Sequence, residues 1–303
     1  MKFLIKNWFN FFSKNQGSNS SAILKEGFID PVTGRHSLDR LYEQFAKPQV
    51  KGLFEPDAPS IYINHKIGQK VLGDYIIDQV FEDKKTGFYA EGRLPLKANQ
   101  PPVLVIRGYG SWYPFYRVIE DTPDVFIASW EGQLKSAEKK GAIAWLKNHT
   151  QQGQKPDMIG ESLGGKVAQQ IVIKYSDYIR STVTYNSLGI SPELAKIAGI
   201  NNIFHYFTLG ERYAFWANRG GYLPGYCFQI SKRGRNWVYK LENKIILKAK
   251  LSDLKNHVKS RNLSQLFWVF IAQIILLKRH NDIILNRHSP VVDIINLEQL
   301  QNI

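Results

Sequence analysis

The sequence predicts an α/β fold, with a mainly parallel sheet and helices on both faces. Between residues 102 and 210, short apolar runs typical of buried strands alternate with runs of helical period, and strands separated by helices usually pair in parallel. The chain has 303 residues, of which 44% are hydrophobic and 13% aromatic. This composition supports a large buried core and excludes a chain that is disordered throughout. The single cysteine, Cys227, excludes an internal disulfide and a cysteine-based zinc site.

The first expected elements are a helix and a hairpin. Residues 37–45 have the pattern of a short helix in which Ser37 is the N-cap, because acidic residues follow it. Two strand-like runs, 74–81 and 87–94, enclose the polar residues 82–86. Such runs around a short polar turn predict an antiparallel β-hairpin.

The alternating part of the chain follows the hairpin. Strands are expected at residues 102–108, 124–130, 157–159, 181–187 and 202–210, and helices at 133–149, 162–180 and about 192–198. We expect residues 22–303 to form one domain with its core at about 74–290. Residues 1–21 would form an amphipathic N-terminal segment with a flexible linker, and a basic helical insertion would lie near the C-terminus.

The formal net charge of +14 is concentrated in two segments. Residues 1–14 carry three lysines and no acid, and residues 232–261 carry ten basic residues against two acids. At helical spacing the first segment places its aromatic side chains opposite its lysines, which is typical of a helix lying in a membrane interface. Packing of these aromatics on the protein's own core is the alternative. The apolar run 263–277 is shorter than the roughly 20 residues of a membrane-spanning helix.

This excess of positive charge indicates an acidic partner. Residues 232–261 have no zinc-finger spacing, helix-turn-helix pattern or ribonucleoprotein motif, which argues against nucleic acid. The expected partner is therefore an anionic membrane surface, and no metal or cofactor is expected. Because residues 1–14 lack the pattern of a cleavable signal peptide, we expect an intracellular peripheral membrane protein; an effector exported by a non-classical route would have the same features. The oligomeric state is left open.

One motif carries chemistry: residues 160–164 are Gly-Glu-Ser-Leu-Gly. A G-x-S-x-G motif between a strand and a helix is typical of a nucleophile elbow, a sharp turn that exposes the serine hydroxyl at the edge of the sheet. The flanking glycines are needed because a Cβ there would collide with neighbouring backbone, and the helix N-terminus favours negative charge on a nearby oxygen. The motif predicts Ser162 as a nucleophile; an ordinary glycine-rich helix start is the alternative.

Three stretches resemble the class 3 lipases, the fungal-lipase-like branch of the α/β-hydrolases. The string GESLGG is similar to the family's GHSLGG, with Glu161 in place of histidine. The string VIRG resembles the strand end that opens the family's oxyanion loop, with Tyr109 in place of threonine. The string LGE, which ends at Glu211 and is followed by GGYLPG, resembles the segment that delivers the catalytic acid.

The resemblance implies an α/β-hydrolase fold over roughly residues 74–290 and a serine hydrolase that cleaves lipid esters through an acyl-enzyme on Ser162. The backbone N–H groups of Leu163 and Tyr109 would form the oxyanion hole. Glu211 stands where the family has aspartate and would be the catalytic acid. Alternatives for this role are Asp253 and Asp282.

The catalytic histidine is expected after Glu211, because the chain order in this fold is serine, acid, histidine. The histidines that meet this condition are His257, His280 and His288. His288 is the first candidate because it lies in a loop near the C-terminus, where the family places its histidine, and His280 is the second. His257 lies in a basic helical stretch and is expected on a solvated face.

Two other functions fit the sequence. The departures at Tyr109, Glu161 and Glu211 suit a catalytically inactive relative that acts as a membrane-binding or interaction module. The serine at the centre of the elbow argues against it, since nothing structural demands serine there. A soluble esterase or thioesterase for small acyl substrates is the second alternative. The aromatic runs 109–116 and 213–216 suit a long acyl chain, and with it a membrane lipid as substrate; packing of these aromatics in the protein's own core is the alternative.

Overall fold

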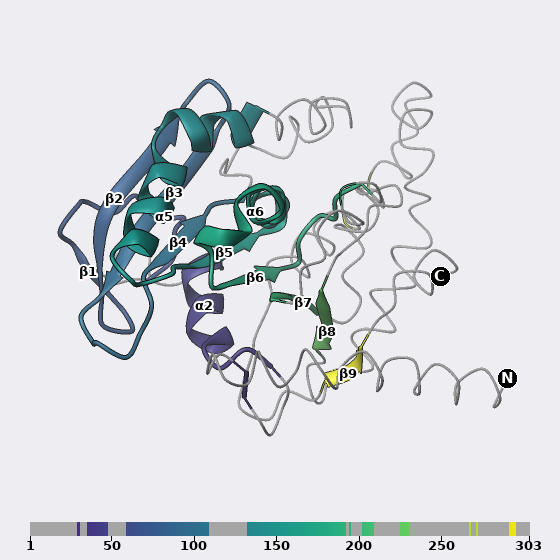
Figure 1. Ribbon diagram of the computed structural model, residues 1–303. Coiled ribbons are helices and arrows are strands. Elements are labelled where there is room, and N and C mark those ends of the chain that lie inside the picture. The colour runs from purple at the N-terminus through teal and green to yellow at the C-terminus, as the bar shows by residue number, and fades with distance from the viewer. Residues whose placement is uncertain are drawn as a thin grey trace, which may run out of the picture.

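The computed structural model describes residues 29–30, 35–47, 59–108, 132–191, 202–208, 225–230 and 291–294, together with the single positions 194, 267 and 271. These residues build one nine-stranded sheet whose strand order follows the chain (Figure 1). The strands are β1 (Lys70–Val71), β2 (Tyr75–Asp83), β3 (Phe88–Pro95), β4 (Val103–Ile106), β5 (Asp157–Glu161), β6 (Ser181–Tyr185), β7 (Ile203–Thr208), β8 (Tyr226–Ile230) and β9 (Val291–Ile294).

The centre of the sheet is parallel and its edges are antiparallel. Strands β4 to β8 pair in parallel with one another, whereas the pairings from β1 to β4 and between β8 and β9 are antiparallel. The predicted α/β class is confirmed. The sheet is mixed because the hairpin of β2 and β3 joins the parallel part at β4, and because β9 runs antiparallel beside β8.

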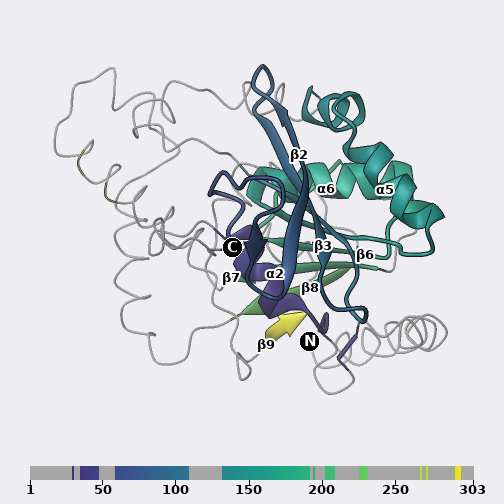
Figure 2. The ribbon, with the colours of Figure 1, turned by 90° about the vertical axis from the view of Figure 1, so that its left-hand side faces the viewer.

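Helices cover both faces of this sheet, as Figures 1 and 2 show. Helix α2 (Asp39–Ala46) lies on one face, and α5 (Ala142–Gln151) and α6 (Ser162–Tyr175) lie on the other. In β4, Val103 and Val105 belong to the core with Tyr42 of α2, while Leu104 and Ile106 belong to the core with α5 and α6. Successive residues of a strand point to opposite faces, so a strand covered on both faces needs an unbroken apolar run.

Helix α2 is present where the sequence predicts a helix, but the predicted cap is wrong. The N-cap is Leu38, and no side chain caps the helix from that position. His36 satisfies the first backbone donors instead: its Nδ1 accepts from the Leu38 N–H at 3.2 Å, and its carbonyl oxygen accepts from the Asp39 N–H at 3.1 Å. A histidine held by tertiary contacts therefore replaces the local cap expected from Ser37.

The predicted helix 133–149 is divided in two. Residues 132–139 are helical, and α5 begins only at Ala142. Gly141 between them has a φ of 94°, a left-handed conformation that ends a helix and that glycine adopts without a steric cost. The helix predicted to reach residue 180 also ends early, at Tyr175, and a 3₁₀ turn (Ser176–Tyr178) follows it.

The predicted hairpin is confirmed as β2 and β3. Its tip is attached to the helix over residues 132–139: Ser136 Oγ donates to Asp83 Oδ2 at 2.8 Å and shares a hydrogen bond with Thr86 Oγ1 at 2.9 Å. Ala90 of β3 pairs with Ile106 at the end of β4. The hairpin tip therefore extends beyond the carboxyl end of β4.

Several predicted segments lie outside the described residues and stay predictions. They are residues 1–21, 124–130 and 232–261 and, apart from single positions, 192–198 and 263–277. The proposed division into one domain and an N-terminal segment is likewise untested. In the described part of the chain, no helix combines the length and the apolar character that crossing a membrane requires.

Candidate active site

Ser162 stands at the turn between β5 and α6 with a φ of 53°. This left-handed conformation costs a residue with a side chain about 1–3 kcal/mol, and it persists where the surroundings enforce it. Because β5 pairs in parallel with β4 and β6, Ser162 lies at the carboxyl edge of the sheet, where open α/β sheets bind ligands. The strand, the strained turn and the helix together give the arrangement of an α/β-hydrolase elbow.

The glycines around Ser162 are fixed by close backbone contacts. A Cβ on Gly160 would lie 2.5 Å from the Gly164 carbonyl oxygen, and a Cβ on Gly164 would lie 2.5 Å from the Ile106 carbonyl oxygen. A Cβ on Gly165 would overlap Ser187 Oγ. Glycine is required here because the first turn of α6 packs directly on the backbone of β4 and β5.

Only part of the predicted catalytic set falls within the described residues. Ser162 and Leu163 adjoin at the start of α6, so the Leu163 N–H is one of the first helical donors, which have no partner within the helix. The other candidates lie outside the described residues and stay predictions: Tyr109, Glu211, Asp253, His257, His280, Asp282 and His288.

Glu161, a departure from the family motif, has defined partners. Its side chain is buried, and Tyr62 donates its hydroxyl hydrogen to Glu161 Oε2. A Cβ on Gly108, two residues after β4, would lie 2.5 Å from Glu161 Oε2 and 2.6 Å from the Tyr62 hydroxyl oxygen. Tyr62 was missed in the sequence because no motif or periodicity marks residues 59–69.

Lys166 is a second residue that sequence reasoning missed. It follows Ser162 by four residues on α6, which places the two on the same side of the helix. Its side chain is only 6% exposed, and burial lowers the pKa of its ammonium group to about 7. The i, i+4 spacing from Ser162 was the signal that could have found it.

A buried polar cluster occupies the opposite edge of the sheet. Asp157 at the start of β5 accepts from Tyr42 at 2.6 Å, from Arg180 at 2.5 and 2.8 Å, and from Ser181 at 2.7 Å. His36 Nε2 lies 2.9 Å from Ser181 Oγ. Burial lowers the pKa of His36 to about 4, and the Arg180 guanidinium helps to hold the pKa of Asp157 below its usual value despite burial, which opposes this shift. In the described ranges, no group of three or more His, Cys, Asp or Glu side chains is placed to hold a metal ion.

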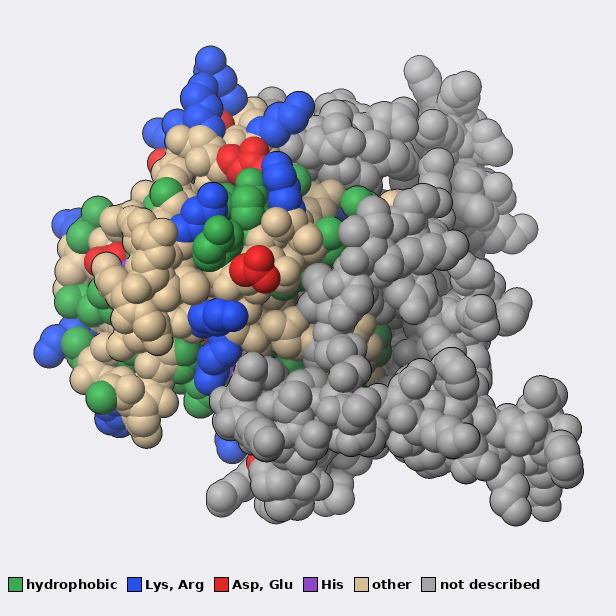
Figure 3. All heavy atoms as spheres, in the orientation of Figure 1, with side chains coloured by type: hydrophobic (Ala, Val, Ile, Leu, Met, Phe, Trp, Pro, Cys, Tyr) green, Lys and Arg blue, Asp and Glu red, His purple; other side chains and the backbone are tan. Residues whose placement is uncertain are grey.

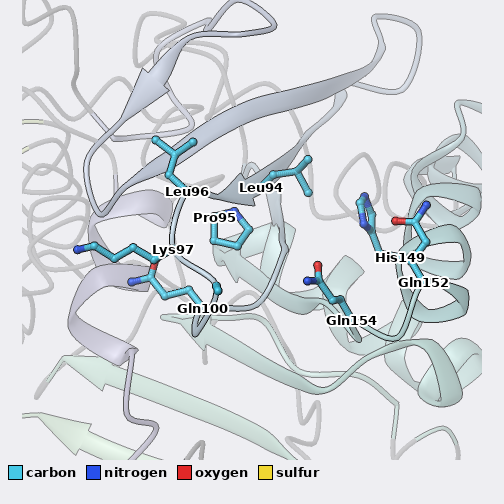
Figure 4. Close-up of a pocket in the computed structure, with 9 residues that line it drawn as sticks. Leu94, Pro95, Leu96, Lys97, Gln100, His149, Gln152 and Gln154 are labelled. Carbon is cyan, nitrogen blue, oxygen red and sulfur yellow. The ribbon is translucent and has the colours of Figure 1, made fainter.

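A shallow hollow of about 380 Å³ also lies away from Ser162. It is lined by Leu94, Pro95, Leu96, Lys97, Ala98, Gln100, His149, Gln152 and Gln154 (Figure 4). These residues lie at the end of β3 and in the loop after it, or at the end of α5 and in the loop before β5, which places the hollow at the amino edge of the parallel strands. It is therefore separate from the candidate active site.

No protein-family model and no curated protein matches the chain. Among solved structures, the Lip2 lipase from Yarrowia lipolytica is similar with 14% identity and a TM-score of 0.44, over 66% of this chain and 80% of that one. Lipase II from Rhizopus niveus is similar with 15% identity and a TM-score of 0.40, over 53% and 68% of the two chains. A triacylglycerol lipase from Penicillium expansum has 15% identity and a TM-score of 0.35, over 52% and 70%.

Proposed function

We propose that this protein is a serine ester hydrolase that acts on lipid esters through an acyl-enzyme on Ser162. The observation that carries the proposal is the left-handed Ser162 at the carboxyl edge of the sheet, enclosed by glycines at positions that leave no room for a Cβ. A fold stable without catalysis has no need for a strained serine at this turn, because a glycine adopts the same left-handed conformation without the steric cost.

The expected chemistry follows from these positions. The Ser162 hydroxyl attacks the ester carbonyl, its proton passes to the catalytic histidine, and the alcohol leaves with that proton. The Leu163 N–H and the N-terminus of α6 stabilise the negative oxygen, and a water then releases the acid. His288, with His280 as alternative, and Glu211 remain the proposed base and its orienting acid.

An anionic lipid surface is the proposed location of the substrate. The N-terminal segment and the basic stretch 232–261 support this by sequence alone. The described residues add exposed lysines at the hairpin tip, on the adjoining helix and in the turn after that helix (Figure 3), namely Lys84, Lys85, Lys135, Lys139 and Lys140. Because Ala90, Ile106 and Gly160 are level across the sheet, these lysines lie toward the same edge as Ser162. Each basic residue near an anionic leaflet contributes about 1 kcal/mol of attraction.

The proposal is tested with a fluorophosphonate probe on the full chain, with and without phosphatidylserine vesicles. We expect wild type to be labelled, Ser162→Ala to be unlabelled, and Ser191→Ala, which alters an exposed serine, to label like wild type. Labelling that vesicles accelerate supports a lipid surface, and labelling indifferent to them favours a small-ester hydrolase. An unlabelled wild type in both conditions contradicts the hydrolase proposal and favours a non-catalytic, membrane-binding module.

The remaining members of the site are tested by single alanine substitutions at Glu211, His280 and His288, with turnover of a p-nitrophenyl acyl ester as the measurement. Loss of turnover at Glu211 and His288 is expected. If His280→Ala abolishes turnover and His288→Ala does not, His280 is the base.

A further inference from the structure

We infer that Tyr62 and Glu161 form a positioning pair that holds the end of β4 against the nucleophile turn; the inference rests on the proposed hydrolase function. The Tyr62 hydroxyl donates to Glu161 Oε2, and both oxygens lie over the Cα of Gly108, as the 2.5 and 2.6 Å separations from an added Cβ show. Glu161 immediately precedes Ser162. The pair thus joins the residue before the nucleophile to the strand end that precedes Tyr109.

The other side of the same strand end is held by α6. A Cβ on Gly164 would lie 2.5 Å from the Ile106 carbonyl oxygen and 2.6 Å from the Arg107 carbonyl oxygen. The last residues of β4 are therefore enclosed between the first turn of α6 and the Tyr62–Glu161 pair. The next amide in the chain is that of Tyr109, the predicted second oxyanion donor. Such donors act only when they are fixed to within about 0.5 Å of the productive geometry.

The chemistry of the pair suits a permanent clamp. Burial, and then the negative charge of Glu161, raise the pKa of Tyr62 well above its ordinary value, so the hydroxyl remains a donor throughout the pH range in which a serine hydrolase works. A buried carboxylate is costly unless it accepts hydrogen bonds, and Tyr62 supplies one. In the family this position is a histidine; here a carboxylate takes a tyrosine partner from a segment 99 residues away.

The test compares Tyr62→Phe and Glu161→Gln with a matched control, Tyr42→Phe. Tyr42 also donates its hydroxyl to a buried carboxylate, Asp157 Oδ2, at 2.6 Å, but Asp157 stands at the start of β5, at the amino edge of the parallel strands. We expect Tyr62→Phe and Glu161→Gln each to lower kcat for a p-nitrophenyl acyl ester about tenfold or more, with KM changed by less than about twofold. The kcat of the double variant should be no lower than that of either single variant, because the two residues act as one unit.

Amide hydrogen exchange of the peptide covering residues 103–108 provides a readout that does not depend on activity. Exchange at the end of β4 should speed up in Tyr62→Phe and stay unchanged in Tyr42→Phe, at similar losses in Tm. Wild-type kcat in Tyr62→Phe, or an equal loss of kcat in Tyr42→Phe, overturns the inference. If Ser162 proves unreactive in wild type, the hydrolase proposal fails, and exchange alone decides: unchanged exchange in Tyr62→Phe overturns the clamp as well.

Discussion

Acid should loosen the attachment of α2 to the sheet through His36. The Leu38 N–H donates to His36 Nδ1, so this nitrogen carries no proton, and Nε2 carries it and donates to Ser181 Oγ. Ser181 in turn donates to Asp157 Oδ1. A second proton on His36 would have to displace the Leu38 N–H, which is the first donor of α2.

The size of the effect follows from the pKa of His36. In the folded chain this pKa is lowered from 6.5 to about 4, chiefly by burial. Below pH 6.5 the unfolded chain therefore binds a proton that the folded chain does not, and stability falls until both states are protonated near pH 4. One pKa unit corresponds to about 1.4 kcal/mol, so the full loss is on the order of 3 kcal/mol, of which about 2 kcal/mol is reached by pH 5.

The assay is urea unfolding at pH 7.5, 6.5, 5.5 and 5.0, with wild type compared with His36→Asn. Asparagine is neutral throughout this range, and its Oδ1 can take over the bond from the Leu38 N–H. The variant should be less stable at pH 7.5 because it packs less well, and it should lose about 2 kcal/mol less than wild type between pH 7.5 and 5.0. Equal losses in the two proteins, or an NMR titration of His36 with a pKa near 6.5 in the folded chain, would refute the reasoning.

Three further variants test the site and its edge. Gly164→Ala should cost about 2–3 kcal/mol and abolish labelling of Ser162, because the new Cβ meets backbone oxygens that cannot give way; labelling at the wild-type rate would contradict the elbow geometry. Lys166→Met should raise the free energy of unfolding at pH 7, because it removes a buried ammonium group. In wild type alone, the free energy of unfolding should rise by about 2 kcal/mol from pH 7 to 9, because the folded chain loses the Lys166 proton that the unfolded chain keeps. A variant that is less stable than wild type and has the same pH dependence would contradict this prediction. Lys84→Glu/Lys85→Glu should weaken co-sedimentation with phosphatidylserine vesicles at low salt, and unchanged binding would remove the hairpin tip from the membrane surface.

Much of the fold could be predicted because its signals are local. The strands β4 and β7 are short, mainly apolar runs, β6 is rich in β-branched residues, and the turn between β2 and β3 is a polar segment between two strand-like runs. The elbow combines a motif of fixed glycines with the strand and helix around it, so Ser162 stands out without any tertiary information. Each of these features depends on residues within about ten positions of one another.

The features that were missed depend on contacts between distant segments. His36 caps α2 only because Ser181, 145 residues later, holds its ring. In the sequence, Glu161 is only a departure from the motif GHSLGG, and its inferred positioning role depends on its contact with Tyr62, 99 residues earlier in the chain. The helix break at Gly141 was overlooked because a single glycine within an apolar periodic run is compatible with a continuous helix. Helix and strand propensities and the spacing of apolar residues therefore predict which elements form, whereas tertiary contacts decide where these elements end and which residues contact them.

The chain contains a second set of serine, histidine and aspartate, and its geometry shows why composition alone does not define a catalytic site. Ser181, His36 and Asp157 are connected by hydrogen bonds of 2.9 and 2.7 Å, closer to a triad than any arrangement seen around Ser162 in the described residues. All three are buried, with exposures of 0 to 1%, and the Ser181 hydroxyl already donates to Asp157, so it has neither access to a substrate nor a proton directed at His36. They also lie at the amino edge of the parallel strands, opposite the edge at which open α/β sheets bind ligands. The strained turn at the carboxyl edge, and not the linked trio, is therefore the place where the proposed nucleophile can meet a substrate.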